Sequence, residues 1–135
     1  MTKERLKNYR ALCEERDEIV RRITEIRTRA EAPKIQRIKA DIVSGGGAGG
    51  VMEETVMVLS QLQELYMMKE RDLAKELLAI ERAIGCLPSR EREILRARYI
   101  DGKRWETICS EKNYSWQHLH RIHAGALRLL EDAIE

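Results

Sequence analysis

The sequence predicts an all-α protein, in which a long antiparallel coiled-coil hairpin of two helices precedes a helix-turn-helix domain of three shorter helices. Charged residues make up 36% of the 135 residues and aromatic residues only 4%, which is typical of helices with solvated faces. Apolar residues recur at steps of three and four, the period of an amphipathic helix, along most of the chain. A glycine-rich run separates the two longest of these segments.

The net charge is only +2, so no strong overall field would attract nucleic acid. The charge is uneven, because residues 1–50 carry +4, residues 51–84 carry −3 and residues 85–135 carry +1. A nucleic-acid partner would therefore depend on local geometry.

The three cysteines are widely spaced and form no CxxC motif, which predicts free thiols in a reducing compartment. No segment resembles a signal peptide or a transmembrane helix. We therefore expect a cytoplasmic protein that does not contact a membrane.

Residues 2–31 have a heptad pattern that predicts a long helix, with Thr2 as its N-cap. Its apolar positions are Leu6, Tyr9, Cys13, Val20, Ile23 and Ala30. A lone amphipathic helix on a globular core is the alternative, but the many polar residues favour a coiled coil. Pro33 is expected to stop or bend the helix, and residues 33–51 are expected to form a flexible glycine-rich connector.

Residues 52–84 predict a second long helix, which is acidic where the first is basic, so the two are expected to pair antiparallel. Its apolar positions are Val56, Leu59, Leu62, Tyr66, Leu73, Leu77, Ile80 and Ile84. Additional Met and Val side chains are either core or an interface with another subunit. Residues 1–84 thus form the predicted hairpin domain, which could pair within one chain or between two chains.

Residues 85–135 form the predicted DNA-binding domain. Gly85 ends the long helix, and Ser89 is expected to cap the next one, which ends before Gly102. A short helix follows over residues 105–112, and Ser115 caps the last helix after a short turn. Three helices with a short turn before the third are the arrangement of a helix-turn-helix domain.

The last helix, residues 115–130, combines a packing face with an outward face. Its apolar stripe is Leu119, Ile122, Ala126 and Leu130. The residues off this stripe are expected to face outward: Trp116, Gln117, His118, His120, Arg121 and Arg128. Because these groups can donate to base edges or phosphates, the segment is predicted to be a recognition helix.

Residues 87–127 resemble region 4 of bacterial sigma-70 factors, and more closely the small phage and prophage regulators related to the ArpU and RinA late-gene activators. The matching residues are Leu87-Pro88, Arg90-Glu91-Arg92, Ile94-Leu95, Arg98-Tyr99, Gly102, Trp105-Glu106, Ile108, Ser115, Arg121-Ile122-His123 and Ala126-Leu127. The resemblance implies that the last helix enters the major groove of double-stranded DNA and that bacterial RNA polymerase is a possible partner.

Carried over by position, the base-contacting residues would be Trp116, Gln117, His118, His120 and Arg121. Sigma factors have Arg, Glu, Arg, Arg and Gln there, so a promoter −35 readout is not expected. Gln117 can pair with adenine, and Arg121 can pair with guanine or a phosphate. Trp116 either contacts a thymine methyl group or a sugar, or packs on Tyr114 or on the hairpin.

The candidate phosphate contacts lie at helix ends. Lys103 and Arg104 begin the second helix of the motif and Ser115 begins the third, where free N–H groups favour an anion. A solvated helix start is the alternative for the first two. Arg128 either holds a phosphate or pairs with a nearby surface carboxylate.

No catalytic residue, metal site or cofactor is predicted. His120 and His123 could share a face, but no third ligand stands at a usual spacing, and His123 is expected to form a structural hydrogen bond. No nucleophile–base pattern suggests an enzyme.

The predicted function is sequence-specific regulation of phage or prophage transcription. The hairpin would form a homodimer or higher oligomer, or contact RNA polymerase. A small terminase-like DNA-packaging subunit is one alternative, since such subunits join a helical DNA-binding domain to coiled-coil oligomerisation. A protein-only adaptor that mimics a sigma or anti-sigma factor is another.

Overall fold

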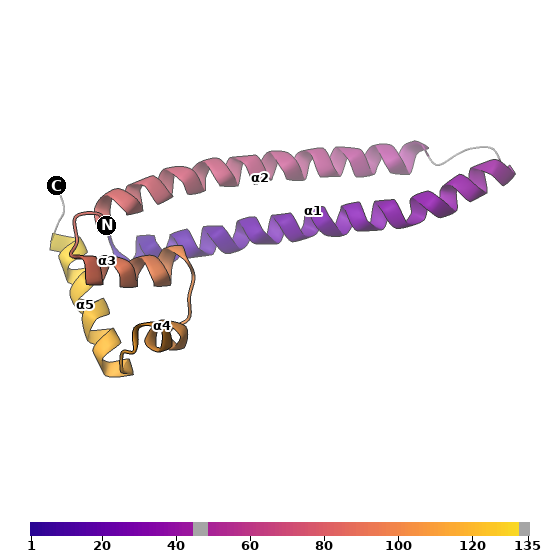
Figure 1. Cartoon of the computed structure of the whole chain (residues 1–135). Helices are drawn as coiled ribbons and strands as arrows, with labels where there is room; N and C mark the ends of the chain where they lie inside the picture. Colours follow the sequence, from indigo (N-terminus) through magenta and orange to yellow (C-terminus); the bar gives the residue numbers. More distant parts are fainter. Residues whose placement is uncertain (45–48, 133–135) are drawn as a thin grey trace. The chain divides into compact units, whose positions relative to one another are not determined.

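The computed structural model describes the backbone of residues 1–44 and 49–132 and the side chains of residues 1–29 and 52–132. The described chain is helical and contains no β-strand (Figure 1). It has five α-helices and one π-helix: α1 (Lys3–Ser44), α2 (Gly49–Ile84), α3 (Ser89–Leu95), η1 (Arg96–Ile100), α4 (Trp105–Lys112) and α5 (Trp116–Asp132). None of the described helices has both the length and the apolar character needed to cross a bilayer.

The chain divides into two compact units, each of which contains parts of α1 and α2. Unit 1 comprises Met1–Cys13 and the chain from Asp72 onward, and unit 2 comprises Glu14–Arg71. The division differs from the expected boundary at residues 84–85. It differs because the first turns of α1 and the last turns of α2 share a hydrophobic core with the short helices.

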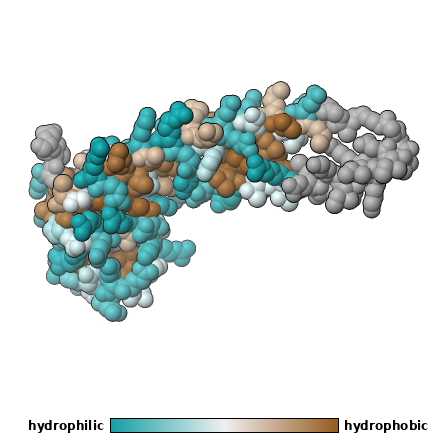
Figure 2. All heavy atoms as spheres, turned by 45° about the horizontal axis from the view of Figure 1, so that its top comes forward, coloured by the Kyte–Doolittle hydropathy of each residue, from teal (hydrophilic) through white to brown (hydrophobic). Residues whose placement is uncertain are grey.

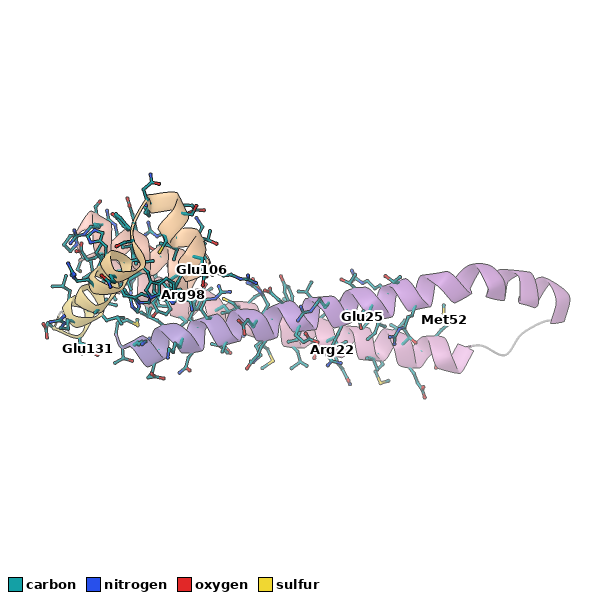
Figure 3. All side chains as sticks on the ribbon, turned by 90° about the horizontal axis from the view of Figure 1, so that it is seen from below. Arg22, Glu25, Met52, Arg98, Glu106 and Glu131 are labelled. Atoms are coloured by element: carbon teal, nitrogen blue, oxygen red, sulfur yellow. The ribbon has the colours of Figure 1, made fainter. Side chains whose placement is uncertain are left out.

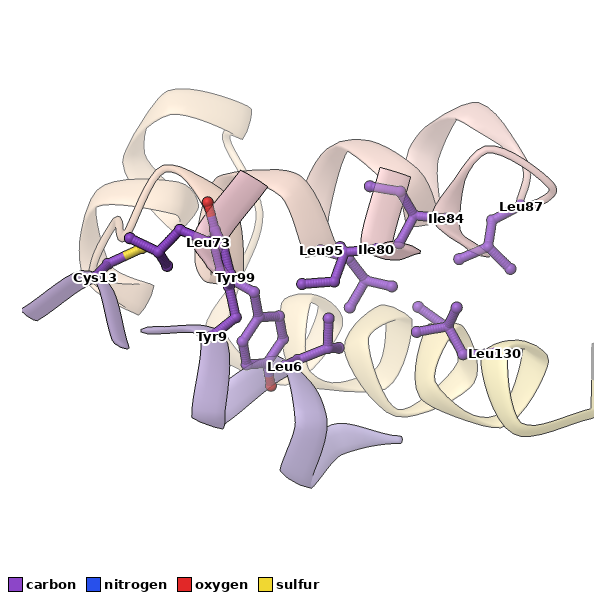
Figure 4. Packing of buried hydrophobic residues seen from close by; sticks show 11 residues of the cluster. Leu6, Tyr9, Cys13, Leu73, Ile80, Ile84, Leu87, Leu95, Tyr99 and Leu130 are labelled. Atoms are coloured by element: carbon purple, nitrogen blue, oxygen red, sulfur yellow. The ribbon is translucent and has the colours of Figure 1, made fainter. Parts of the chain in front are cut away.

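The core of unit 1 draws on all parts of that unit. Eleven buried residues form its main cluster (Figure 4): Leu6, Tyr9, Cys13, Leu73, Ile80, Ile84, Leu87, Leu95, Tyr99, Ala126 and Leu130. The residues from α1 recur at steps of three and four, so one face of that helix is buried here. A smaller cluster joins η1, α3, α4 and α5 through Ile94, Ala97, Ile108, Leu119 and Ile122.

In unit 2, α1 and α2 are joined by ion pairs. Arg16 donates to Glu70 at 3.0 Å, and Lys69 donates to Glu15 at 2.7 Å. Exposed pairs of this kind contribute only about 0.2–1 kcal/mol each, so they select the partner helix more than they stabilise it. Ile23 is buried in this unit, whereas Val20 is 41% exposed, so the predicted apolar stripe is only partly covered.

Pro33 does not stop the first helix, since α1 continues to Ser44 and α2 begins at Gly49. Most of the predicted connector, residues 33–51, is therefore helical, and residues 45–48 lie outside the described part. A proline removes one hydrogen bond at a cost of about 3 kcal/mol, but it does not prevent the next turns from forming. Ile35, Ile38 and Ile42 keep the helical period beyond it.

Two of the predicted caps are confirmed and one is wrong. Thr2 Oγ1 accepts from the N–H of Arg5 at 3.3 Å, and Ser115 Oγ accepts from the N–H of His118 at 3.1 Å. Pro88, not Ser89, occupies the N-cap position of α3, and Ser89 is its first helical residue. A proline just before the first turn suits α3, since its fixed φ directs the chain into the helix.

Candidate nucleic-acid interface

A tight turn connects α4 to α5. Asn113 ends α4 in the left-handed conformation, with φ of 57°, which asparagine tolerates better than most residues. The N–H of Tyr114 donates to the carbonyl of Cys109 at 3.0 Å, and Ser115 then caps α5. The turn is thus closed by local hydrogen bonds on both sides, so the first turn of α5 has a defined position relative to α4.

The packing face of α5 is the one that the sequence predicts. Its four stripe residues are at most 4% exposed: Leu119, Ile122, Ala126 and Leu130. The opposite face exposes Gln117, Arg121, Ala124 and Arg128, again at steps of four, three and four. Within the described residues, the side chains of Gln117, Arg121 and Arg128 form no hydrogen bond or ion pair. Arg128 therefore does not pair with Glu131 or Asp132.

Five rings connect the core of unit 1 to the surface at the start of α5; we call them the aromatic column. They are Tyr99, His123, Trp105, His120 and Trp116. The ring centroids are 4.6 Å apart for Trp105 and His123, 5.1 Å for Trp105 and His120, and 4.4 Å for Trp116 and His120. Trp116, at the outer end, is 51% exposed. Its ring partner is His120, and not Tyr114 or the hairpin, which were the packing alternative for this residue.

The inner end of the column is an uncharged hydrogen-bonded pair. The Tyr99 hydroxyl and His123 Nε2 are 2.8 Å apart, so His123 has the structural hydrogen bond that was predicted. Burial, reinforced by the charges of Lys3, His120 and Arg98, lowers the pKa of His123 to about 4. Burial also raises the pKa of Tyr99. Both rings are therefore neutral at pH 7.

His118 and His120 do not lie open to solvent, which corrects the prediction that both face outward. His118 packs edge-on against Tyr114, with centroids 4.9 Å apart. His120 is held between two indoles, and its Nε2 is buried without a hydrogen-bond partner among the described residues. Helical spacing alone places these positions off the apolar stripe, but it does not reveal that aromatic neighbours from α4 and the turn cover them.

Of the two predicted phosphate contacts at the start of α4, Arg104 is unpaired within the described residues and Lys103 is paired. Arg104 is exposed at the N-cap position of α4, and its side chain has no partner among the described residues. Lys103 Nζ instead forms an ion pair with Glu111 at 2.8 Å. The Ser115 hydroxyl accepts a backbone N–H, which leaves its own proton available to a phosphate oxygen.

Two arginines that the sequence did not single out for this site hold the loop that carries Lys103 and Arg104. Arg98, which is labelled in Figure 3, donates to the carbonyl of Lys103 at 3.0 Å, and its guanidinium lies 4.6 Å from the Trp105 ring centroid. Arg10, from α1, donates to the carbonyl of Ile100 at 3.1 Å. Arg10 lies beside the apolar stripe of α1, which is a signal in the sequence that its side chain is partly buried. Its hydrogen-bond partner, Ile100, is 90 residues away, so no local sequence pattern indicates it.

The imidazoles do not gather into a metal centre. The ring centroids of His120 and His123 are 6.5 Å apart. No group of three or more His, Cys, Asp or Glu side chains in the described part of the chain is placed to hold a metal ion.

Comparisons with known proteins assign no family. No protein-family model matches the chain, and no curated protein or solved structure matches it either. The proposed function is therefore based on the residues and geometry of unit 1.

Proposed function

We propose that the protein is a sequence-specific, double-stranded-DNA-binding regulator of phage or prophage transcription. In this proposal α4, the turn at Asn113 and α5 form a helix-turn-helix like that of sigma-70 region 4. α5 is the recognition helix. The observation that carries the proposal is the open face of α5, where Gln117, Arg121 and Arg128 have no partner within the described residues.

The spacing of this face suits a major groove. Gln117 and Arg121 lie one helical turn apart near the N-terminus of α5, where a recognition helix contacts base edges. At a rise of about 1.5 Å per residue, Arg128 lies about 16 Å along α5 from Gln117. This distance exceeds the width of the major groove, which is about 12 Å. We therefore assign Gln117 and Arg121 to bases and Arg128 to a phosphate at the groove edge.

The remaining phosphate contacts would come from the two helix starts. Arg104 is free at the start of α4, and the Ser115 hydroxyl stands at the start of α5. Lys103 would have to leave Glu111 to bind a phosphate, so its contribution is smaller.

The long helices supply the second part of the proposal, an antiparallel coiled-coil hairpin that self-associates or contacts RNA polymerase. Exposed apolar side chains along α2 support it (Figure 2). Among them Val56, Met57, Met67 and Met68 are 58–63% exposed, so they are not part of a core in the described chain. Large exposed apolar side chains that gather on one element favour an interface.

The same exposed residues also fit a second candidate, a DNA-packaging subunit that assembles into a ring. Light scattering separates the two, since a regulator is expected to be a monomer or dimer and a packaging subunit to form a ring of many copies.

The experiment that tests DNA binding is selection of bound duplexes from a random pool, followed by affinity measurements at several salt concentrations. Enrichment of one sequence and a steep loss of affinity with salt are expected. Arg121→Ala and Gln117→Ala should each weaken specific binding about 5- to 150-fold, from about 1–3 kcal/mol per base contact. Arg82→Ala, an exposed arginine of α2, is the matched control.

Failure to enrich any duplex would refute the proposal. Enrichment that is insensitive to Gln117→Ala and Arg121→Ala would move the DNA contact away from α5. Binding to RNA polymerase without binding to DNA would favour a protein-only adaptor.

A further inference from the structure

The outermost ring of the aromatic column occupies an unusual position for a tryptophan. Trp116 is the first residue of α5 and is half exposed, although burial of its large indole would stabilise the folded state considerably. It is supported from beneath, because His120 contacts it at 4.4 Å between centroids and Trp105 supports His120 at 5.1 Å.

The support continues into the core, so the exposed indole is held more firmly than a surface side chain. Trp105 meets His123 edge-on at 4.6 Å, and His123 is hydrogen-bonded to Tyr99. The Arg98 guanidinium lies over the Trp105 ring, 4.6 Å from its centroid. A rigid apolar group presented to solvent loses little conformational entropy when it contacts a ligand.

The ring beneath Trp116 does not offer its Nε2 to a ligand. His120 Nε2 is buried and has no partner among the described residues, so this atom cannot reach a base edge. The exposed indole of Trp116 is an apolar surface, and it is directly followed by the exposed amide of Gln117.

We propose that Trp116 is a specificity-determining residue that contacts the C5-methyl group of one thymine, and that His120 is its positioning residue. The methyl group of thymine is the only apolar feature that a base pair presents in the major groove, so it is the natural partner of a supported indole beside Gln117. The inference rests on the proposed function, and it assigns to His120 a supporting role in place of base contact.

The test replaces thymine by uracil, which removes only the methyl group, at each position of the duplex selected by the full-length protein. At one position the wild-type protein should lose affinity about fourfold, which corresponds to the burial of one methyl group. Trp116→Ala should bind the thymine and uracil duplexes equally, because the affinity that the methyl group contributes depends on the indole.

Two variants of His120 test the positioning role. His120→Ala removes the support and should reduce the thymine preference, whereas His120→Phe keeps an aromatic ring without the unpartnered nitrogen and should retain it. Denaturant unfolding of each variant shows whether the fold is intact, and His120→Phe keeps the test valid if His120→Ala does not fold.

Three outcomes would overturn the inference while leaving the proposed function in place. These are equal affinity for thymine and uracil at every position, an unchanged preference in Trp116→Ala, and a loss of preference in His120→Phe. If a single-stranded pool is enriched through Trp116 instead, the indole stacks on unpaired bases and both proposals fail. If no nucleic acid is enriched, both fail as well.

Discussion

At the scale of single residues, the site depends on groups whose surroundings change their usual behaviour. His123 is neutral well below its ordinary titration range, His120 holds a buried nitrogen without a partner, and Gly102 adopts a backbone conformation with φ of 70°. The first two properties do not follow from residue type, because they depend on the rings that lie against the two imidazoles, whereas glycine tolerates a positive φ because it has no Cβ.

Gly102 should not tolerate a side chain. A Cβ at this position would lie 2.6 Å from Arg10 Nη2, and the residue would have to adopt a positive φ, which strains any residue with a Cβ. Gly102→Ala is therefore expected to lower the free energy of unfolding by about 1–2 kcal/mol and to disturb the bond from Arg10 to Ile100. Urea denaturation measures the change.

Gly125→Ala is the matched control, because a Cβ at Gly125 meets nothing within 4 Å and the residue lies inside α5. This substitution should raise the free energy of unfolding by about 0.5–1 kcal/mol. An equal response of the two glycines would contradict the account of Gly102.

His123 should make the fold sensitive to acid. Its pKa is about 4 in the folded protein and 6.5 ordinarily, so the unfolded chain binds more protons between these values. The contribution of His123 to stability is complete above about pH 6.5 and is lost as the pH falls towards 4. We expect a loss of about 3 kcal/mol over this window, measured by urea denaturation at a series of pH values.

His123→Gln removes the titrating group and is the control. Its free energy of unfolding should depend less on pH between 4 and 6.5 than that of the wild type. The same slope in both proteins would assign the acid sensitivity to other groups.

At the scale of elements, the structure separates what local hydrogen bonds determine from what packing determines. Ser115 caps α5 and the stripe of α5 is buried, as the periodicity predicts. α1 does not stop at Pro33, because the helical period continues on both sides of the proline. The segment expected to be one helix before Gly102 contains α3 and the π-helix η1.

The turn between α4 and α5 should depend on the left-handed residue Asn113. Asn113→Gly is expected to leave the melting temperature unchanged or to raise it, since glycine has no Cβ to strain. Asn113→Ala should lower the free energy of unfolding by about 1 kcal/mol. Thermal denaturation of the pair tests this, and equal stability of the two variants would mean that the turn relaxes to another conformation.

At the scale of the whole molecule, the main core of unit 1 includes the ends of α1 and α2, whereas the short helices form only the smaller cluster among themselves. Leu6 and Ile84 are fully buried beside Leu95 and Leu130. Residues 85–135 were predicted to form a separate domain, but within unit 1 part of the buried surface of α3 and α5 faces residues from outside that range.

Leu6→Ala should therefore destabilise unit 1 strongly, by about 2–5 kcal/mol, because it leaves a cavity in a core shared by four α-helices and η1. Leu78→Ala, at a position 52% exposed in the same unit, should change the free energy of unfolding by less than about 0.5 kcal/mol. Urea denaturation compares them.

A fragment of residues 85–135 should correspondingly show little helical signal by circular dichroism. A stably helical fragment would show that the core contributed by α1 and α2 is dispensable.

The sequence by itself determined the helical class, the apolar stripe of α5, the cap at Ser115 and the exposure of Gln117 and Arg121. These features depend on the period of the chain and on hydrogen bonds between residues a few positions apart. Only the tertiary structure decided that Leu6 and Tyr9 belong to the core beside α5, that Lys103 pairs with Glu111, and that His120 lies between two indoles. Most of these contacts join separate elements, such as Leu6 with α5 and Trp105 with His120, so no local pattern specifies them.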